Sequence, residues 1–216
     1  MNVANALAAA AGAWAAGAHL HDIRQGLRTF TTSFFQAPGR LNYVEVGGVR
    51  AIIDYCHNVD GMRNLADFVN RLMADGTAGL RTRRAIGVIG MPGDRRDEDM
   101  RAYGALAATA FDEVIVREDK NLRGRAPGET ATLVVGGIRA DRGATDGHVR
   151  ASRVDKILDE ATAVRTALRR ANPGDLVVMC VDDAVGVYRE TMALGGSSDA
   201  GGAAFADPGE LEAPEG

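Results

Sequence analysis

Short apolar runs alternate with longer stretches of helical periodicity over most of this 216-residue chain, and this alternation constrains the fold more than any other feature. Strands are expected at 41–46 and 49–55, joined by the hairpin signal Gly47-Gly48, and at 85–90, 113–117 and 175–181. Helices are expected at 59–74, 97–111, 130–138 (complete or partial), 155–171 and from the last strand to about 194. This pattern predicts an α/β fold with a Rossmann-like, mostly parallel sheet flanked by helices.

The two ends of the chain differ from its middle in composition. Helices are expected at 2–17 and 20–30, and this pair alone cannot bury its apolar faces. We interpret residues 1–37 as the tail of another domain plus a linker, and residues 38–194 as the α/β domain. From residue 195 onward Gly, Ala and acidic residues dominate without Lys or Arg, which predicts a disordered tail over 195–216.

The bulk composition excludes several classes of function. The formal net charge of −4 and the pI of about 5.6 argue against a nucleic-acid surface. No apolar stretch reaches the roughly 20 residues that span a bilayer, and no basic leader precedes an apolar run, so we expect no membrane partner and a cytoplasmic protein. The two cysteines lack C-x-x-C spacing and the histidines lack ligand spacing, so no metal site is predicted.

The run Asp54-Tyr55-Cys56-His57-Asn58 directly follows an expected buried strand. It places a carboxylate, an imidazole and an amide where ligands bind in open α/β sheets, ahead of a helix N-terminus. Asp54 can accept ribose hydroxyls, while His57 and Asn58 can donate to phosphate oxygens. The alternative is an aspartate that caps the following helix and a histidine packed at its edge.

Three further groups of charged residues precede or follow strands. Arg40, after Pro38-Gly39, offers a guanidinium suited to a transferring phosphoryl group, or it is a surface arginine paired with an acid. The loop containing Gly93, Asp94, Arg95 and Arg96 could bind a carboxylate or phosphate, or be a solvated loop with Asp97 as a cap. The cluster of Glu118, Asp119, Arg123 and Arg125 could hold a charged amino acid, or be a flexible loop.

Four motifs carry a resemblance to a known family. They are PGRLN at 38–42, DYCHN at 54–58, PGDRRDED at 92–99 and EDKNLRGR at 118–125. Together they resemble the C-terminal domain of the Mur ligase family, and within it the cyanophycin synthetases, over about residues 2–194. The family pattern has Ala and Pro where this chain has Cys56 and Val59.

The resemblance implies an ATP-dependent ligase that forms amide bonds through an acyl phosphate. In the cyanophycin synthetases arginine is added to the side-chain carboxylates of an aspartate/arginine polymer, with ATP and Mg²⁺ as cofactors. By the same resemblance residues 1–37 are the end of the family's central ATPase domain plus a linker, and Asn5 in it is a candidate for adenine contact. Arg40 and His57 are candidates for catalysis, and Asp54, His57 and Asn58 for the nucleotide. The implied substrate-binding residues are Gly93, Asp94, Arg95, Arg96, Glu118, Asp119, Arg123 and Arg125.

One expected motif does not occur. No phosphate-binding loop of the Gly-x-x-Gly-Lys-Thr type is present in the chain. We therefore expect the chain to be inactive alone, and to need upstream ATP-grasp and P-loop domains, or a polypeptide carrying them, which would supply most Mg²⁺ ligands. The alternatives are a non-catalytic split subunit or assembly module and, less favoured, a ligase of cell-wall or folate precursors; the oligomeric state stays open, a homo-oligomer included.

Overall fold

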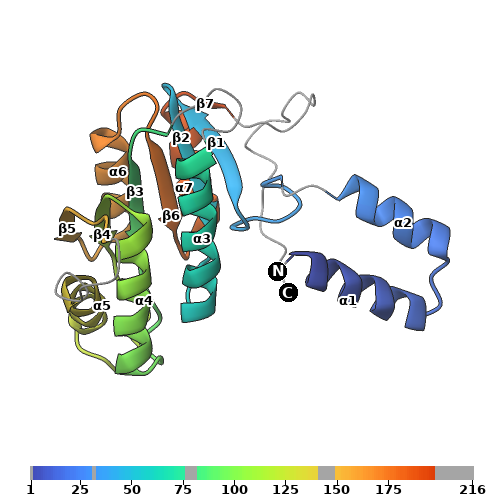
Figure 1. Cartoon of the computed structure of the whole chain (residues 1–216), viewed down its shortest axis with the longest axis horizontal. Coiled ribbons are helices and arrows are strands. Elements are labelled where there is room, and N and C mark those ends of the chain that lie inside the picture. Colours follow the sequence, from blue (N-terminus) through green and yellow to red (C-terminus); the bar gives the residue numbers. More distant parts are fainter. Residues whose placement is uncertain (1, 31–32, 76–81, 141–148, 198–216) are drawn as a thin grey trace.

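The computed structural model describes residues 2–30, 33–75, 82–140 and 149–197. Residues 31–32 of the predicted linker and residues 198–216 of the predicted tail lie outside the described residues, as do residues 1, 76–81 and 141–148. Seven strands form one sheet in the order β5-β4-β3-β6-β2-β1-β7 (Figure 1). The strands are β1 (Asn42–Val46), β2 (Val49–Asp54), β3 (Ala85–Ile89), β4 (Glu113–Val116), β5 (Arg153–Lys156), β6 (Leu176–Cys180) and β7 (Gly196–Ser197).

Five adjacent strands run parallel, which confirms the expected fold class. β2 pairs with β6, β6 with β3, β3 with β4 and β4 with β5, all in parallel register. β1 is antiparallel to β2 and to β7. Gly47 and Gly48 join β1 to β2 with φ values of +56° and +80°, the left-handed conformations that a tight hairpin turn needs. The hairpin predicted from this glycine pair is therefore confirmed.

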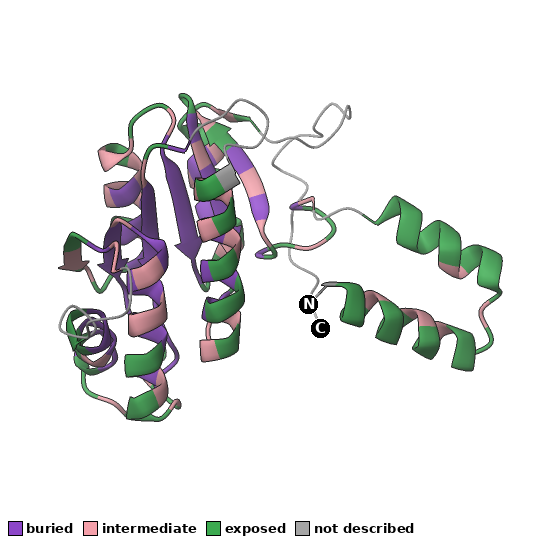
Figure 2. Ribbon diagram, viewed as in Figure 1, coloured by how far each residue is buried: buried purple, intermediate pink, exposed green. Residues whose placement is uncertain are grey.

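Helices cover both faces of the sheet. The chain forms α1 (Asn2–Ala15), α2 (Leu20–Thr29), α3 (Val59–Asp75), α4 (Asp97–Ala110), α5 (Glu129–Ala140), α6 (Glu160–Arg170) and α7 (Ala184–Ala193). One apolar core lies between the sheet and α3, α4 and α5, and a second lies between the sheet and α6 and α7. Burial on both faces explains why β3 and β6 are continuous apolar runs and why β4 is apolar after Glu113 (Figure 2).

The first two helices form a hairpin that stands apart from the sheet (Figure 1). Val3, Leu7 and Trp14 are 75%, 66% and 74% exposed, respectively. Figure 2 shows the hairpin almost wholly in the colour of exposed residues. The next described segment is anchored, because the ring of Phe34 stacks on Tyr188 of α7 with the ring centroids 3.8 Å apart.

Two sequence-based boundaries are wrong. The helix predicted over 155–171 begins only at Glu160, and residues 153–156 form the edge strand β5 instead. Asp159 caps α6 by accepting the backbone N–H of Thr162 at 2.8 Å, which sets the later start. At the other edge, Gly196–Ser197 pairs with β1 as β7, so the predicted disordered tail does not start at residue 195.

None of the described helices is long and apolar enough to cross a membrane.

Adjacent glycines in α5 have opposite packing roles. A Cβ built at Gly137 would lie 2.0 Å from the carbonyl oxygen of Arg101 in α4, whereas one at Gly136 would have nothing within 4 Å. Gly104 of α4 is equally restricted, because a Cβ there would lie 2.1 Å from the carbonyl oxygen of Val134. The two helices therefore approach backbone to backbone, and glycine is required on both sides of the contact.

This contact yields a matched pair of variants. Gly137→Ala should lower the free energy of unfolding by about 1–3 kcal/mol through overpacking. Gly136→Ala should raise it by about 0.5–1 kcal/mol, because alanine is the better helix former and meets open space. Urea unfolding of both variants measures the difference, and equal effects would contradict the close contact of α4 and α5.

Candidate functional site

Strand β6 has a topological switch point on each side. Its neighbours β2 and β3 are followed by α3 and α4 on one face of the sheet, while β6 is followed by α7 on the other. Ligands of open α/β sheets bind at the carboxyl ends of strands where such a reversal occurs. A ligand at this edge would therefore meet the residues that follow β2, β3, β4 and β6.

At the β2 side, Asn42 organises the loop that carries Arg40. The Asn42 side chain is buried; its Oδ1 accepts the backbone N–H of Gly39 at 2.6 Å and of Arg40 at 3.3 Å. Its Nδ2 donates to the carbonyl of Ala37 at 3.0 Å. Gly39 in turn accepts the N–H of Tyr55 at 2.8 Å, so the loop is fixed against the end of β2. The PGRLN motif thus folds around its own asparagine.

Asp54 completes this attachment. Its Oδ2 accepts the backbone N–H of Leu41 at 3.0 Å, where Leu41 has the left-handed φ of +50°. Burial raises the pKa of Asp54, although the Leu41 N–H and the charge of Arg40 both act to lower it. Asp54 does not cap α3, so the capping alternative for this residue is wrong.

Asn58 is the residue that caps α3. Its Oδ1 accepts the N–H of Gly61 at 2.7 Å. His57 is half-buried, its Nδ1 lies 2.8 Å from the carbonyl of Tyr55, and its ring packs against the Tyr55 ring with the centroids 4.9 Å apart. The guanidinium carbon of exposed Arg40 lies 6.0 Å from the same ring centroid. Arg40, Asp54 and His57 therefore gather at the end of β2.

The two charged loops after β3 and β4 are tied to each other. Arg125 donates to the carbonyls of Gly93 at 2.7 Å and Arg95 at 2.8 Å, and pairs with Asp97 and Glu129. Gly93 allows the approach, since a Cβ there would lie 2.1 Å from the carbonyl oxygen of Leu122. Arg123 of the second loop also pairs with Asp94 of the first at 2.9 Å. Arg96 pairs with Asp99 at the start of α4, also at 2.9 Å.

Several predicted substrate residues already have partners within the chain. Glu118 is buried and accepts the N–H of Gly128 at 2.7 Å and the hydroxyl of Thr130, at the start of α5. The guanidinium N–H groups of Arg125 hold the two loops together. Arg95 differs, because its buried Nε has no hydrogen-bond partner in the described part of the chain, with Asp94 4.0 Å away. Substrate contact by these residues stays a prediction.

The best-connected residue of this edge, Arg117, was missed by sequence reasoning. It follows β4, crosses the end of β3 and donates to the carbonyl of Cys180 on β6 through Nε at 3.1 Å and Nη2 at 3.0 Å. A Cβ at Gly90, the residue after β3, would lie 2.7 Å from the Arg117 Nε. Glycine is therefore required for the arginine to pass. The buried side chain links three strand ends.

Arg117 is surrounded by an excess of carboxylates. Its Nη1 lies 2.9 Å from Asp182, 3.4 Å from Glu160 and within hydrogen-bond distance of Asp119. Burial acts against the arginine charge, but Asp182, Glu160 and Asp119 together raise its pKa. Burial also raises the pKa of Asp119 to about 6, with Arg117 opposing the rise and Asp182 adding to it. Three acids around one cation give the β3 side of β6 a net negative charge.

The acid cluster itself is held by backbone contacts. Glu160, the first residue of α6, accepts the N–H groups of Asp182 at 2.7 Å and Asp183 at 3.1 Å. The Asp182 side chain is 35% exposed, against 11% for Asp119 and 9% for Glu160. Asp182 is therefore the acid most open to a ligand. The aspartate pair directly after the last apolar run was the sequence signal that could have found it.

The structure separates the remaining predicted residue from this edge. Asn5 lies exposed on α1, in the helical hairpin away from the sheet (Figure 1). Among the described residues no group of three or more His, Cys, Asp or Glu is arranged to hold a metal ion. The residues after β2 fit a nucleotide by their chemistry, with a carboxylate for ribose hydroxyls and a cation for phosphate.

Comparisons with known proteins identify the family. The model described as "Mur ligase, glutamate ligase domain" matches residues 39–180. The cyanophycin synthetase of Synechocystis sp. is 42% identical over 177 residues, covering 82% of this chain and 18% of that protein. The cyanophycin synthetase of Crocosphaera subtropica is 40% identical over the same shares. This chain thus spans about a fifth of the length of these relatives.

More distant relatives share the fold. The UDP-N-acetylmuramoyl-L-alanyl-D-glutamate–2,6-diaminopimelate ligase of Corynebacterium efficiens is 32% identical over 82% of this chain and 31% of that protein. A murein peptide ligase from Psychrobacter arcticus aligns with a TM-score of 0.63 at 18% identity, over 89% of this chain and 36% of that one. The E. coli FolC structure with DHPP and ADP aligns with a TM-score of 0.60 at 20% identity, over 88% and 38%.

The resemblance seen in the four sequence motifs is confirmed by the matched family model and by these identities. The chain belongs to the Mur ligase family and carries its glutamate ligase domain in a form similar to that of cyanophycin synthetases.

Proposed function

We propose that this chain is the C-terminal part of an ATP-dependent acid–amino-acid ligase of the cyanophycin synthetase kind. In the reaction a carboxylate attacks the γ-phosphate of ATP, giving an acyl phosphate and ADP. An amine then attacks the acyl carbon, forming the amide and releasing phosphate. The observation that carries the proposal is that β6 separates a nucleotide-type residue set from an acidic residue set, within a chain 42% identical to a cyanophycin synthetase.

The β2 side would act on the nucleotide. Arg40 is exposed on a loop that Asn42 and Asp54 hold in place, so its guanidinium can neutralise charge on phosphate oxygens without reordering the backbone. Asp54 suits the ribose hydroxyls, and His57 suits a phosphate oxygen. ATP supplies the phosphoryl group when it is bound. Asn58 contributes by capping α3 and by orienting the turn before it.

The β3/β6 side would receive the incoming amino acid. The acids around Arg117 exceed its charge, and Asp182 is open to solvent, so a guanidinium or ammonium group fits there. Arg95, with its unpartnered Nε, suits the carboxylate of the same amino acid. A basic amino acid such as arginine matches both. A polymer containing aspartate would present the carboxylate that becomes phosphorylated.

Ligation would depend on further domains. The chain has no Gly-x-x-Gly-Lys-Thr loop, and it corresponds to 18% of the relatives' length. We propose that ATP-grasp and P-loop domains, on the same or another polypeptide, complete the site and provide the Mg²⁺ ligands. The exposed Val3, Leu7 and Trp14 of the helical hairpin also favour a second candidate, a binding subunit without catalytic chemistry.

A chimera separates the two candidates. In Synechocystis cyanophycin synthetase the matching C-terminal part is replaced by this chain, and ATP-dependent incorporation of labelled arginine is measured. We expect turnover, and a loss of at least about 100-fold in kcat for Arg40→Ala because phosphoryl charge is left unneutralised. Arg71→Ala, an exposed arginine on α3, is the matched control and should change little.

A chimera that folds and assembles but incorporates no amino acid would refute the ligase proposal and support the binding subunit. Incorporation of another amino acid in place of arginine would refute the substrate assignment alone.

The raised pKa of Asp119 gives the chimera a pH signature. At pH 5 the Asp119 carboxyl is mostly protonated, since its pKa is about 6, and at pH 7.5 it is ionised. The arginine guanidinium stays charged at both pH values. The KM for arginine should therefore fall about two- to fivefold as pH rises through 6. A change of this size corresponds to the binding free energy of one partly exposed ion pair. Asp119→Asn should remove this dependence, and an unchanged pH profile in that variant would exclude Asp119 from substrate binding.

A further inference from the structure

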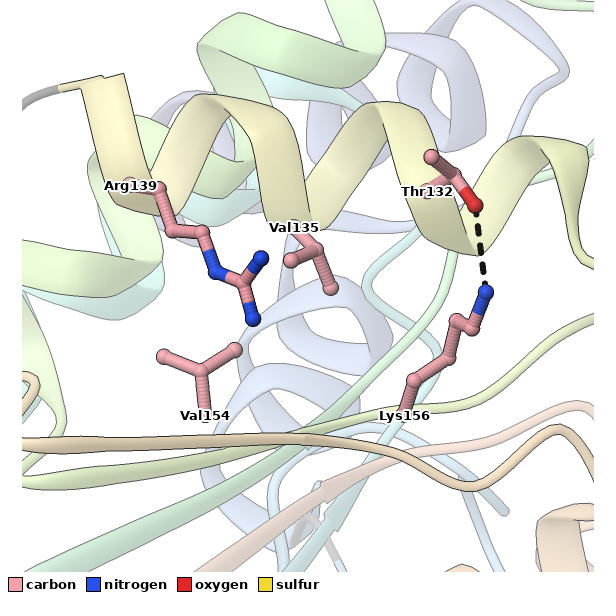
Figure 3. A pocket seen from close by; sticks show the side chains of 5 residues that line it. All are labelled: Thr132, Val135, Arg139, Val154 and Lys156. Carbon is pink, nitrogen blue, oxygen red and sulfur yellow. Dashed lines mark hydrogen bonds between the residues drawn. The ribbon is translucent and has the colours of Figure 1, made fainter.

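A groove lies between α5 and the edge strand β5, away from the residues assigned to nucleotide and amino acid. It has a volume of about 280 Å³ and is lined by Thr132, Val135 and Arg139 of α5 and by Val154 and Lys156 of β5 (Figure 3). The spacings i, i+3, i+7 on a helix and i, i+2 on a strand put each set on one face. The lining therefore follows from the regular geometry of both elements.

The groove is apolar in its middle and cationic at both ends. Val135 points from α5 toward the strand, the guanidinium of Arg139 reaches over Val154, and Lys156 lies at the opposite end (Figure 3). The Lys156 ammonium donates to the Thr132 hydroxyl at 3.2 Å. Within the described residues neither Arg139 nor Lys156 forms an ion pair. The other face of β5 differs, because Asp155 and Arg153 pair there.

The backbone of β5 adds a second feature. β5 is the last strand in the sheet order, so in the part of the chain that the structure describes no strand pairs with its outer side. The N–H groups of Arg153 and Ile157 point inward to the carbonyls of Asp112 and Val116, at 3.4 Å and 3.0 Å. By the alternation of a strand, the backbone groups of Val154 and Lys156 point outward. The two residues that line the groove thus also offer the free hydrogen-bonding edge.

We propose that this edge and groove bind an extended acidic peptide segment. The peptide would add as a strand beside β5, with main-chain bonds to Val154 and Lys156. Alternate side chains would then point into the groove, where carboxylates meet Lys156 and Arg139. The site stands independently of the ligase function, because it uses neither the residues after β2 nor those around Arg117.

Fluorescence anisotropy with the full 216-residue chain tests this binding. The probe is a fluorescein-labelled ten-residue peptide of alternating Asp and Thr, which has the strand propensity and the alternation that the groove requires. A peptide of alternating Asn and Thr is the neutral, isosteric control. We expect saturable one-to-one binding of the acidic peptide, weakened by salt, and at least about tenfold weaker binding of the neutral one.

Two variants assign the charge contribution. Arg139→Glu combined with Lys156→Glu should weaken binding about tenfold or more. Arg24→Glu combined with Arg71→Glu changes the net charge equally at exposed positions of α2 and α3, and should bind as the unaltered chain does. Circular dichroism establishes that both variants fold. Equal weakening by the two pairs would mean a non-specific charge effect and would overturn the proposal.

A modified peptide assigns the backbone contribution without altering the protein. The Asp/Thr peptide carrying N-methyl groups at alternate residues cannot donate along one edge, and it should bind about tenfold more weakly. Undiminished binding of the methylated peptide would overturn strand addition. Competition by free aspartate or citrate at the affinity of the peptide would identify a small-anion site instead.

Discussion

The bridge made by Arg117 is the interaction on which the carboxyl edge of the sheet depends. A guanidinium from the end of β4 passes over Gly90 at the end of β3 and binds the Cys180 carbonyl on β6. A buried arginine is stable only where carboxylates and carbonyls satisfy it, and here Asp182, Glu160 and Asp119 do so. Removing one partner of such a set leaves buried charge uncompensated, so the three loops depend on one another.

A second constraint acts on the other side of β6. Asn42 and Asp54 join the loop before β1 to the end of β2, although they lie 12 residues apart in sequence. This arrangement holds the arginine of the loop at the strand end where a nucleotide would bind. The two sides of β6 thus use different means: amide and carboxylate contacts to backbone on one side, and a charge network on the other. The same strand keeps the two residue sets next to each other, as the proposed reaction between a phosphorylated acid and an amine would require.

Sequence reasoning succeeded where the pattern was periodic and strong. The buried runs of β3, β4 and β6 and the glycine pair of the hairpin predicted their elements correctly. It failed at β5, where Arg153 and Asp155 make a charged strand whose pairing with β4 is a long-range property. It also failed at β7, because a Gly-Ser pair in a low-complexity region gains its structure only from β1.

In the candidate site, too, local motifs were predicted correctly and long-range contacts were not. Arg40, Asp54 and His57 were predicted from motifs and do gather at the end of β2, although their roles remain proposals. Arg117 looked like the last residue of a strand, since nothing in its neighbourhood in the chain indicates that it reaches β6. Glu118 is the opposite case. As a charged residue in a family motif it was predicted to bind substrate, but its carboxylate oxygens accept hydrogen bonds from Gly128 and Thr130 at the start of α5. Long-range partners decide both cases.

Amide hydrogen exchange on the Arg117→Gln variant measures whether Arg117 holds this edge together. The N–H groups of Asp182 and Asp183, which donate to Glu160, should lose protection, while those of α4 and α5 should retain theirs relative to global unfolding. Arg170→Gln, which disrupts an ion-pair network with Glu113 and Asp155, is the control and should leave Asp182 and Asp183 protected. Unchanged exchange at Asp182 and Asp183 in the Arg117→Gln variant would contradict the claim that Arg117 holds this edge together.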